Sequence, residues 1–137
     1  MRDSFPLMKI MSLVGLLTLL ALGCGDDASE ADRLGVGAEC TGSADCDVVD
    51  EVELDCLTQF KGGYCGLADC EGDEDCPQGS ACVTHSGDGQ NYCFRLCEIK
   101  PDCNRNRAPD NEANCVGSID FVDPRNERKA CEPPSGS

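Results

Sequence analysis

Cysteine is the residue that most constrains how this chain can fold. Thirteen of the 137 residues are cysteine. From Cys24 onward only 17 residues are Val, Ile, Leu or Phe, and none is Met, which leaves too little apolar side chain for a large core. An exported, cysteine-dense chain of this kind is normally held together by covalent cross-links. A large enzyme core is therefore excluded.

Twelve of the cysteines form three copies of one unit: Cys40, Cys46, Cys56 and Cys65, then Cys70, Cys76, Cys82 and Cys93, then Cys97, Cys103, Cys115 and Cys131. In each unit five residues separate the first two cysteines, and Asp precedes the second one, at Asp45, Asp75 and Asp102. The first cysteines of successive units lie 30 and 27 residues apart. We therefore expect tandem repeats at 40–69, 70–96 and 97–131, followed by a tail at 132–137.

The stretch from the third to the fourth cysteine of each unit predicts a hairpin. Gly62 and Gly63 provide the turn in the first unit, residues 86–89 in the second, and residues 123–126 in the third, after a short apolar strand at 119–122. No segment after Cys24 shows helical periodicity over more than two turns. The expected fold is small, disulfide-rich and mostly irregular, with short β-hairpins in three tandem cysteine repeats.

The N-terminal residues indicate export. Arg2 and Lys9 precede a mostly apolar run of 13 residues, from Ile10 to Leu22. That run is shorter than the roughly 20 residues that a helix needs to cross a bilayer, but it is typical of the core of a signal peptide.

The run leads into Leu20-Ala21-Leu22-Gly23-Cys24, which resembles the lipobox of bacterial lipoproteins. The resemblance implies that residues 1–23 are a lipoprotein signal peptide and that Cys24 becomes the mature N-terminus, carrying covalently attached lipid. Parity agrees, because assigning Cys24 to lipid leaves an even number of cysteines to pair. The alternative is an ordinary signal peptide and an unmodified Cys24.

The residue after Cys24 bears on location. It is Gly25, and in Gram-negative bacteria a residue other than Asp at this place permits export to the outer membrane. The expected location is therefore the cell envelope of a Gram-negative bacterium, at the outer membrane, facing the periplasm or the cell surface. Residues 24–39 are expected to form a lipidated N-terminus and a flexible acidic tether.

The second unit, from Cys70 to Cys82, resembles the cysteine-rich modules of Dickkopf-type proteins and the central motif of whey-acidic-protein inhibitors. The Dickkopf-like resemblance implies a secreted binding module. Pairing within units leaves 27 patterns open. Comparable small modules join the first cysteine to the third and the second to the fourth, which implies the disulfides Cys40–Cys56, Cys46–Cys65, Cys70–Cys82, Cys76–Cys93, Cys97–Cys115 and Cys103–Cys131. Each would contribute about 3 kcal/mol in the chain-entropy model.

Catalytic and metal-binding patterns are weak. His85 is the only histidine, and we expect it to be a bystander in a solvated loop. An exported chain oxidises its thiols, so disulfides are favoured over zinc. The acidic stretches at 45–55 and 73–75 do not match a calcium loop, and solvated acidic loops are the favoured interpretation. We therefore expect no enzyme activity, no metal and no cofactor apart from the lipid on Cys24.

Charge bears on the partners. The whole chain has a formal net charge of −15, which disfavours nucleic acid. Residues 24–94 hold 17 acidic and 2 basic side chains, whereas residues 95–137 hold 8 acidic and 7 basic ones. A partner of the acidic repeats is expected to carry a basic patch.

The sequence therefore predicts a membrane-anchored lipoprotein that acts as a non-enzymatic protein-binding or adhesion module. The protein partner and the oligomeric state stay open. One alternative is a protease inhibitor that presents a basic residue of the 104–107 loop, Asn104-Arg105-Asn106-Arg107. The other is a purely structural envelope protein.

Overall fold

The computed structural model of the chain describes residues 28–49, 52–125 and 127–136. The expected signal peptide and Cys24 lie outside these residues. Within the described part, no helix is long and apolar enough to cross a membrane. The helical elements are short: α1 (Glu30–Leu34) and the 3-10 turns η1 (Ser43–Asp45), η2 (Asp73–Asp75), η3 (Lys100–Cys103) and η4 (Pro109–Asn111).

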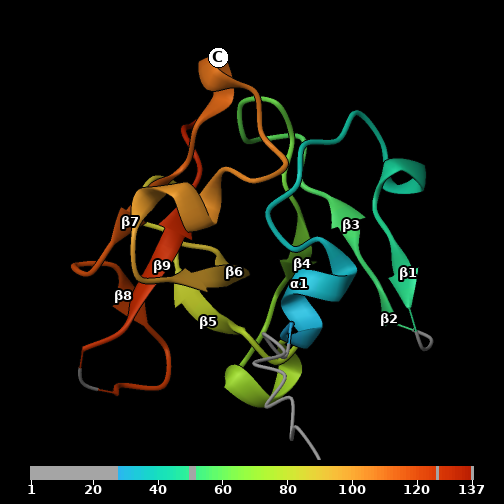
Figure 1. Cartoon of the computed structure of the whole chain (residues 1–137). Coiled ribbons are helices and arrows are strands. Elements are labelled where there is room, and N and C mark those ends of the chain that lie inside the picture. Colours follow the sequence, from blue (N-terminus) through green and yellow to red (C-terminus); the bar gives the residue numbers. More distant parts are fainter. Residues whose placement is uncertain (1–27, 50–51, 126, 137) are drawn as a thin grey trace, which may run out of the picture.

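The strands are short and antiparallel (Figure 1). They are β1 (Val48–Val49), β2 (Val52–Glu53), β3 (Asp55–Cys56), β4 (Cys65–Ala68), β5 (Ser80–Thr84), β6 (Asn91–Cys97), β7 (Asn114–Val116), β8 (Asp120–Phe121) and β9 (Lys129–Glu132). The main sheet has the order β3-β4-β6-β5-β8, and β9 pairs with both β6 and β7. The expected class, a small disulfide-rich fold of short β elements in three repeats, is confirmed.

The register of the strands is the same in all three units. The third and fourth cysteines stand directly opposite each other on paired strands, as Cys56 and Cys65, Cys82 and Cys93, and Cys115 and Cys131. The third unit differs from the expected hairpin. The segment expected as its first strand contains β8, but β8 pairs with β5 of the second unit. Within the third unit, β9 pairs with β7.

Six disulfides join the twelve cysteines of the three units. The bonds are Cys40–Cys56, Cys46–Cys65, Cys70–Cys82, Cys76–Cys93, Cys97–Cys115 and Cys103–Cys131. Each unit thus pairs its first cysteine with its third and its second with its fourth, which is the pattern of comparable small modules. Because the third and fourth cysteines are cross-strand neighbours, the two disulfides of a unit lie side by side on its paired strands.

An aromatic cluster forms the largest apolar core, and the first two units share it. Phe60 and Tyr64 come from the first unit, and Tyr92 and Phe94 from β6 of the second. The ring of Phe60 meets those of Tyr92 and Phe94 edge-on, at centroid distances of 5.2 and 5.6 Å. Such contacts are favourable beyond simple burial, so this cluster fixes the first unit against the second.

The segment expected to be a flexible tether is part of the fold from residue 28 onward, so that expectation is wrong for 28–39. Ser29 and Asp32 form a capping box at the start of α1, and Gly35 ends the helix in the left-handed conformation. Leu34 is completely buried and Val36 nearly so, both in the aromatic core. The physical reason is that a single helical turn needs only two or three apolar residues to dock on an existing core.

Contacts between units make one body of the three repeats. The amide of Lys61 donates to the carbonyl oxygen of Pro134 at 2.9 Å, and that of Gly136 donates to Gln59 at 2.9 Å. The C-terminal tail therefore lies along the turn of the first unit. On the other side, Arg128 Nη1 lies 2.7 Å from Asp73 Oδ2 and ties the third unit to the second.

Candidate functional site

The repeated aspartate has a structural role in every unit. Asp45 accepts hydrogen bonds from the amide and hydroxyl of Thr41, each at 2.8 Å. Asp75 accepts from the Glu71 amide at 2.8 Å, and Asp102 accepts from the Glu98 amide at 3.0 Å. In each case the donor amide follows the first cysteine of the unit. The carboxylate therefore closes the five-residue loop, which explains why Asp recurs with the spacing.

These hydrogen bonds favour the ionised carboxylate. Donation by the backbone amide and hydroxyl of Thr41 and by the amide of Gly42 lowers the pKa of Asp45 below its usual value. The amides of Glu98 and Ile99 lower the pKa of Asp102 in the same way, with smaller contributions from nearby arginines. Both carboxylates are thus held in their charged form by the loops that they close.

The acidic stretch 73–75 is largely occupied by contacts within the protein. Asp73 Oδ1 accepts from the Cys82 amide at 3.1 Å, and its Oδ2 meets Arg128. The amide of Asp73 donates to Asp123 at 2.7 Å. Glu74 is the one residue of this stretch that is exposed and whose carboxylate accepts none of the described hydrogen bonds. The stretch therefore acts mainly as a joint between the second and third units.

Sulfur atoms gather in three places in the described residues: Cys40, Cys46 and Cys65; Cys70, Cys76 and Cys93; and Cys97, Cys103 and Cys131. All nine are in disulfides. A metal needs a thiolate, and a disulfide sulfur offers none. These groups are therefore stacked cross-links and would have to be reduced before they could bind zinc.

His85 is buried, so the expectation of a solvated loop histidine is wrong. Its side chain is 8% exposed, and its ring lies edge-on to Phe60 at a centroid distance of 5.2 Å. The Nδ1 atom is 3.1 Å from Asp88 Oδ1, and Asp88 Oδ2 accepts from the Tyr92 hydroxyl at 2.8 Å. Sequence reasoning missed this role because the neighbouring residues Ser86 to Gln90 are indeed exposed. His85 thus extends the aromatic core.

Asp88 is the polar end of this network. Partial burial alone would raise the pKa of its carboxyl, but hydrogen bonds from Gln90, Tyr92 and His85 outweigh burial and lower the pKa. The carboxylate therefore stays charged and orients the imidazole from the solvent side. This arrangement fixes His85 against the core. The neighbouring Ser86 shares no described side-chain hydrogen bond with His85, so the two residues do not resemble a nucleophile with its base.

The loop proposed for protease inhibition carries one buried and one exposed arginine. Arg107 is 8% exposed, and its guanidinium donates to the carbonyl oxygens of Gly37, Lys61 and Gly63 at 2.8–3.1 Å. It cannot be offered to a protease. Arg105 is exposed, with 65% of its side chain accessible, and lies 3.6 Å from Asp102.

The conformation of this loop is a closed turn. The amide of Arg107 donates to Asn104 at 3.3 Å, and the carbonyl oxygen of Asn106 accepts from the Glu39 amide at 3.2 Å. Arg105 therefore stands at the corner of a turn. An extended segment, which would align as a strand in a binding cleft, is a different conformation.

A groove missed by sequence reasoning lies between the first unit and η4. It has a volume of about 530 Å³ and is open to solvent. Its walls include Glu39, Asp45, Thr58, Gly62 and Asn111. Glu39 Oε1 accepts hydrogen bonds from the Ala108 amide at 2.7 Å and the Asn111 side chain at 2.9 Å.

The groove combines acidic groups with apolar surface, because Glu39 and Asp45 share its walls with Cys40 and Phe60. Burial tends to raise the pKa of Glu39, but hydrogen bonds from Asn111 and Ala108 and the charge of Arg107 outweigh it, so the pKa is lowered. Glu39 and Asp45 are thus both ionised on the groove wall at neutral pH. The only feature of the sequence that pointed to this groove was the Gly62-Gly63 pair, which the sequence analysis interprets as a turn.

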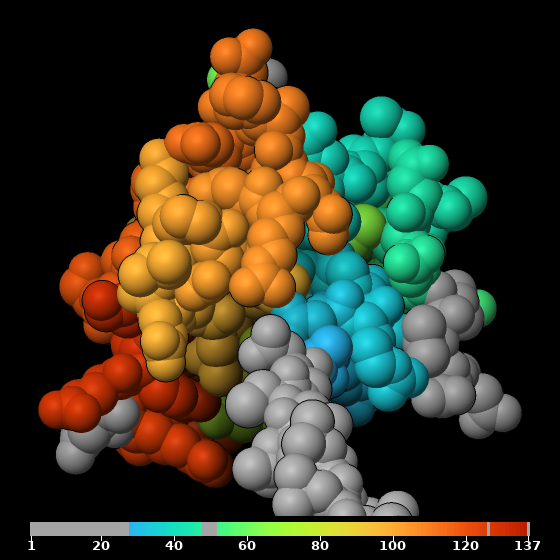
Figure 2. All heavy atoms as spheres, viewed as in Figure 1, coloured from blue at the N-terminus to red at the C-terminus, as the bar shows by residue number. Residues whose placement is uncertain are grey.

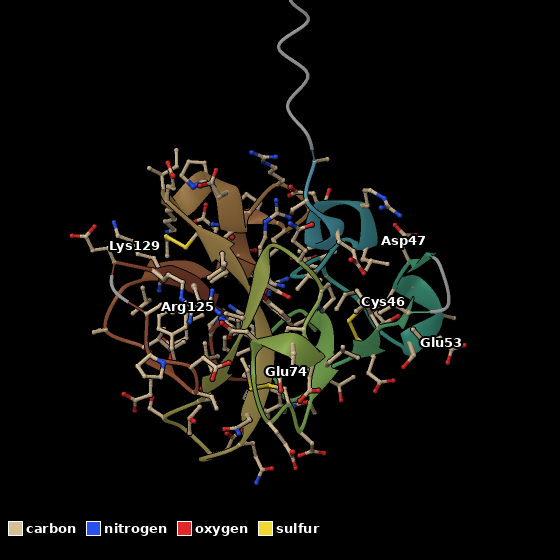
Figure 3. The ribbon with its side chains drawn as sticks, turned by 90° about the horizontal axis from the view of Figure 1, so that it is seen from below. Cys46, Asp47, Glu53, Glu74, Arg125 and Lys129 are labelled. Atoms are coloured by element: carbon tan, nitrogen blue, oxygen red, sulfur yellow. A yellow bond between two sulfur atoms is a disulfide. The ribbon has the colours of Figure 1, made fainter. Side chains whose placement is uncertain are left out.

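The surface is slightly more acidic than the residue counts suggest, because Arg107 is buried among carbonyl oxygens with no carboxylate among its hydrogen-bond acceptors. The buried ion pair of Arg95 with Asp32 removes one charge of each sign and leaves the balance unchanged. Figure 3 shows Asp47 and Glu53 on one side of the molecule and Lys129 on the other. The first unit therefore presents a mainly acidic surface.

Comparison with known proteins gives no match: no family model, no characterised protein and no solved structure is significantly similar to this chain.

Proposed function

We propose that this chain is a lipoprotein of a bacterial cell envelope, anchored through Cys24, whose disulfide-bonded body serves as a non-enzymatic protein-binding or adhesion module. The proposal rests on the signal-peptide pattern, the lipobox resemblance of Leu20 to Cys24 and the cysteine content. The only cofactor in the proposal is the covalent lipid.

The pairing of the cysteines carries this proposal. The twelve cysteines from Cys40 to Cys131 are all in disulfides within the described residues. The thirteenth cysteine of the sequence is Cys24, which lies outside the described residues and follows the lipobox-like residues. A lipid thioether at Cys24 would account for the odd number without a reactive thiol in an oxidising compartment.

A binding role is supported by the rigidity of the surface. Loops that are pinned by disulfides and by carboxylate–amide hydrogen bonds lose little conformational entropy when they bind, which favours affinity. The exposed acidic groups and the groove beside Glu39 favour a partner with a basic patch. The inhibitor alternative is less well supported, because Arg107 is buried and Arg105 lies on a closed turn.

Capture of the partner from intact cells tests the binding role. The tagged full-length protein should retain a protein partner, and association should slow as salt rises, because exposed charges are screened beyond about 10 Å at 0.1 M salt. The double variant Asp47→Asn/Glu53→Gln removes exposed charges from the first unit without breaking a described contact. The matched control is Asp120→Asn/Glu127→Gln in the third unit.

We expect the first double variant to slow association and to flatten its salt dependence, and the control to leave both unchanged. If both variants behave like the unaltered protein, the acidic surface serves solubility only. If no partner is retained at any salt concentration, the binding role is contradicted in favour of a structural one.

A further inference from the structure

The structure makes the connection between the proposed lipid and the folded body very short. Ser29 and Asp32 cap α1, and the Ala31 amide donates to Gln78 at 2.7 Å. Leu34 is completely buried. The described part of the chain begins at Ala28, just before α1, and four Cα–Cα steps separate Cys24 from Ala28. At 3.8 Å per step, these span at most about 15 Å.

This length is small compared with the body. A chain of about 100 residues folds to a radius of gyration near 13 Å, hence a diameter of roughly 35 Å. A tether of at most about 15 Å therefore cannot let the body turn over above a membrane. The surface around the start of α1 must stay next to the lipid surface in which the tether ends.

The two ends of the molecule differ. In Figure 1, η4 stands at the top of the molecule, whereas the start of α1 lies in the lower half, where Glu30 lines one hollow together with Glu74 of η2. The contact between Ala31 and Gln78 places the residues just after η2 at the α1 end. Glu39 and Asn111 of the groove, together with the C-terminal tail on residues 59–61, belong to the upper end. Figure 2 shows the residues around 105–111, in orange, standing above α1, in blue and cyan.

We propose that this protein is held with its α1 end against the lipid surface and its η4 end, with the acidic groove, directed away from it. The surface around the start of α1 therefore lies next to the membrane, and the groove at the η4 end stays open to a protein partner. This inference rests on the proposed lipid at Cys24. The short connection, and not affinity for lipid, sets the orientation.

Energy transfer from two positions to the membrane tests the orientation. The lipidated protein is purified from cells and reconstituted into phosphatidylcholine vesicles that contain a headgroup-labelled acceptor. A donor dye is placed by a bioorthogonal side chain at Gln78 or at Asp110, both exposed and neither with a described side-chain contact. We expect several-fold more transfer from position 78 than from position 110, with equal melting temperatures.

A longer tether is the matched control. Twelve Gly and Ser residues inserted between Asp27 and Ala28 add a root-mean-square length of about 20 Å, and the difference between the two positions should then largely disappear. Equal transfer from both positions at the native length would overturn the orientation. The mass of the N-terminal peptide separates the two failures: with lipid on Cys24, equal transfer refutes only the orientation, whereas an unmodified Cys24 refutes the anchor as well.

Discussion

Arg107 donates a hydrogen bond through Nη1 to the carbonyl oxygen of Gly63 at 2.9 Å, and this bond joins the third cysteine unit to the first. The same guanidinium also donates to Lys61 and Asn111, so one side chain satisfies carbonyl groups from two units. Such a planar fork cannot be replaced by an ammonium group. Arg107 thus holds together the end of the molecule that carries the groove.

Replacing Arg107 should therefore destabilise the whole body. For Arg107→Lys we expect the free energy of unfolding to fall by about 3 kcal/mol, because several buried carbonyl groups lose their donor. Thermal or chemical unfolding measures this effect. The matched control is Arg105→Lys in the same exposed turn, which should change stability by less than about 0.5 kcal/mol. Equal effects of the two substitutions would contradict the role assigned to Arg107.

Gly63 should tolerate no side chain. Its φ of +69° lies in the left-handed region, and an added Cβ would stand 2.1 Å from the carbonyl oxygen of Cys40. We expect Gly63→Ala to cost more than about 2 kcal/mol, measured by unfolding. Gly42→Ala is the control, because an added Cβ there meets nothing within 4 Å. A Gly63→Ala protein as stable as Gly42→Ala would show that the backbone here is free to move.

Acid should weaken the loops that Asp45 and Asp102 close. Their pKa values are lowered in the folded protein, so the charged carboxylates stabilise the fold at neutral pH. This contribution is fully present above the unfolded pKa of about 3.9 and is lost as pH falls through the lower folded value. Melting temperatures between pH 6 and pH 2 measure it.

Asp45→Asn should lower the melting temperature at pH 6 and reduce its fall in acid. Asp47→Asn is the control, because Asp47 is exposed and does not cap the loop. An Asp45→Asn protein with the same acid dependence as the unaltered protein would rule out the proposed contribution of this carboxylate.

The disulfides should be indispensable. Each closes a loop of 12–28 residues and is worth about 3 kcal/mol in the chain-entropy model. We expect reduction to abolish the folded structure at ambient temperature, seen as loss of circular dichroism and of protection from proteolysis. The cysteines from Cys40 to Cys131 should not react with alkylating reagents before reduction. Reactive thiols together with stoichiometric zinc would refute the disulfide framework.

The sequence predicted the repeats well and the contacts between them poorly. The five-residue gap and the Asp at positions 45, 75 and 102 recur because they build a local structure, a loop closed by its own carboxylate. Local patterns of this kind can be read from one chain. Arg107 and His85 are different, because their partners lie far away in sequence or belong to a core that forms only after the units meet.

The helix α1 also depends on contacts that the sequence alone does not reveal. An acidic, glycine-containing segment is usually solvated, but here Leu34 and Val36 pack into the aromatic core, which residues of the first and second units form. No periodicity over five residues could indicate this. The groove beside Glu39 was missed for a similar reason, since its walls come from the first unit and from η4.

The mass of the N-terminal peptide of the mature protein tests the account most directly. The account predicts that the mature chain isolated from cells begins at Cys24 and carries the mass of a diacylglycerol thioether there. It also predicts that the protein partitions into detergent and that Cys24→Ser abolishes this partitioning or blocks processing. A mature protein that begins at another residue and carries no lipid would contradict the account.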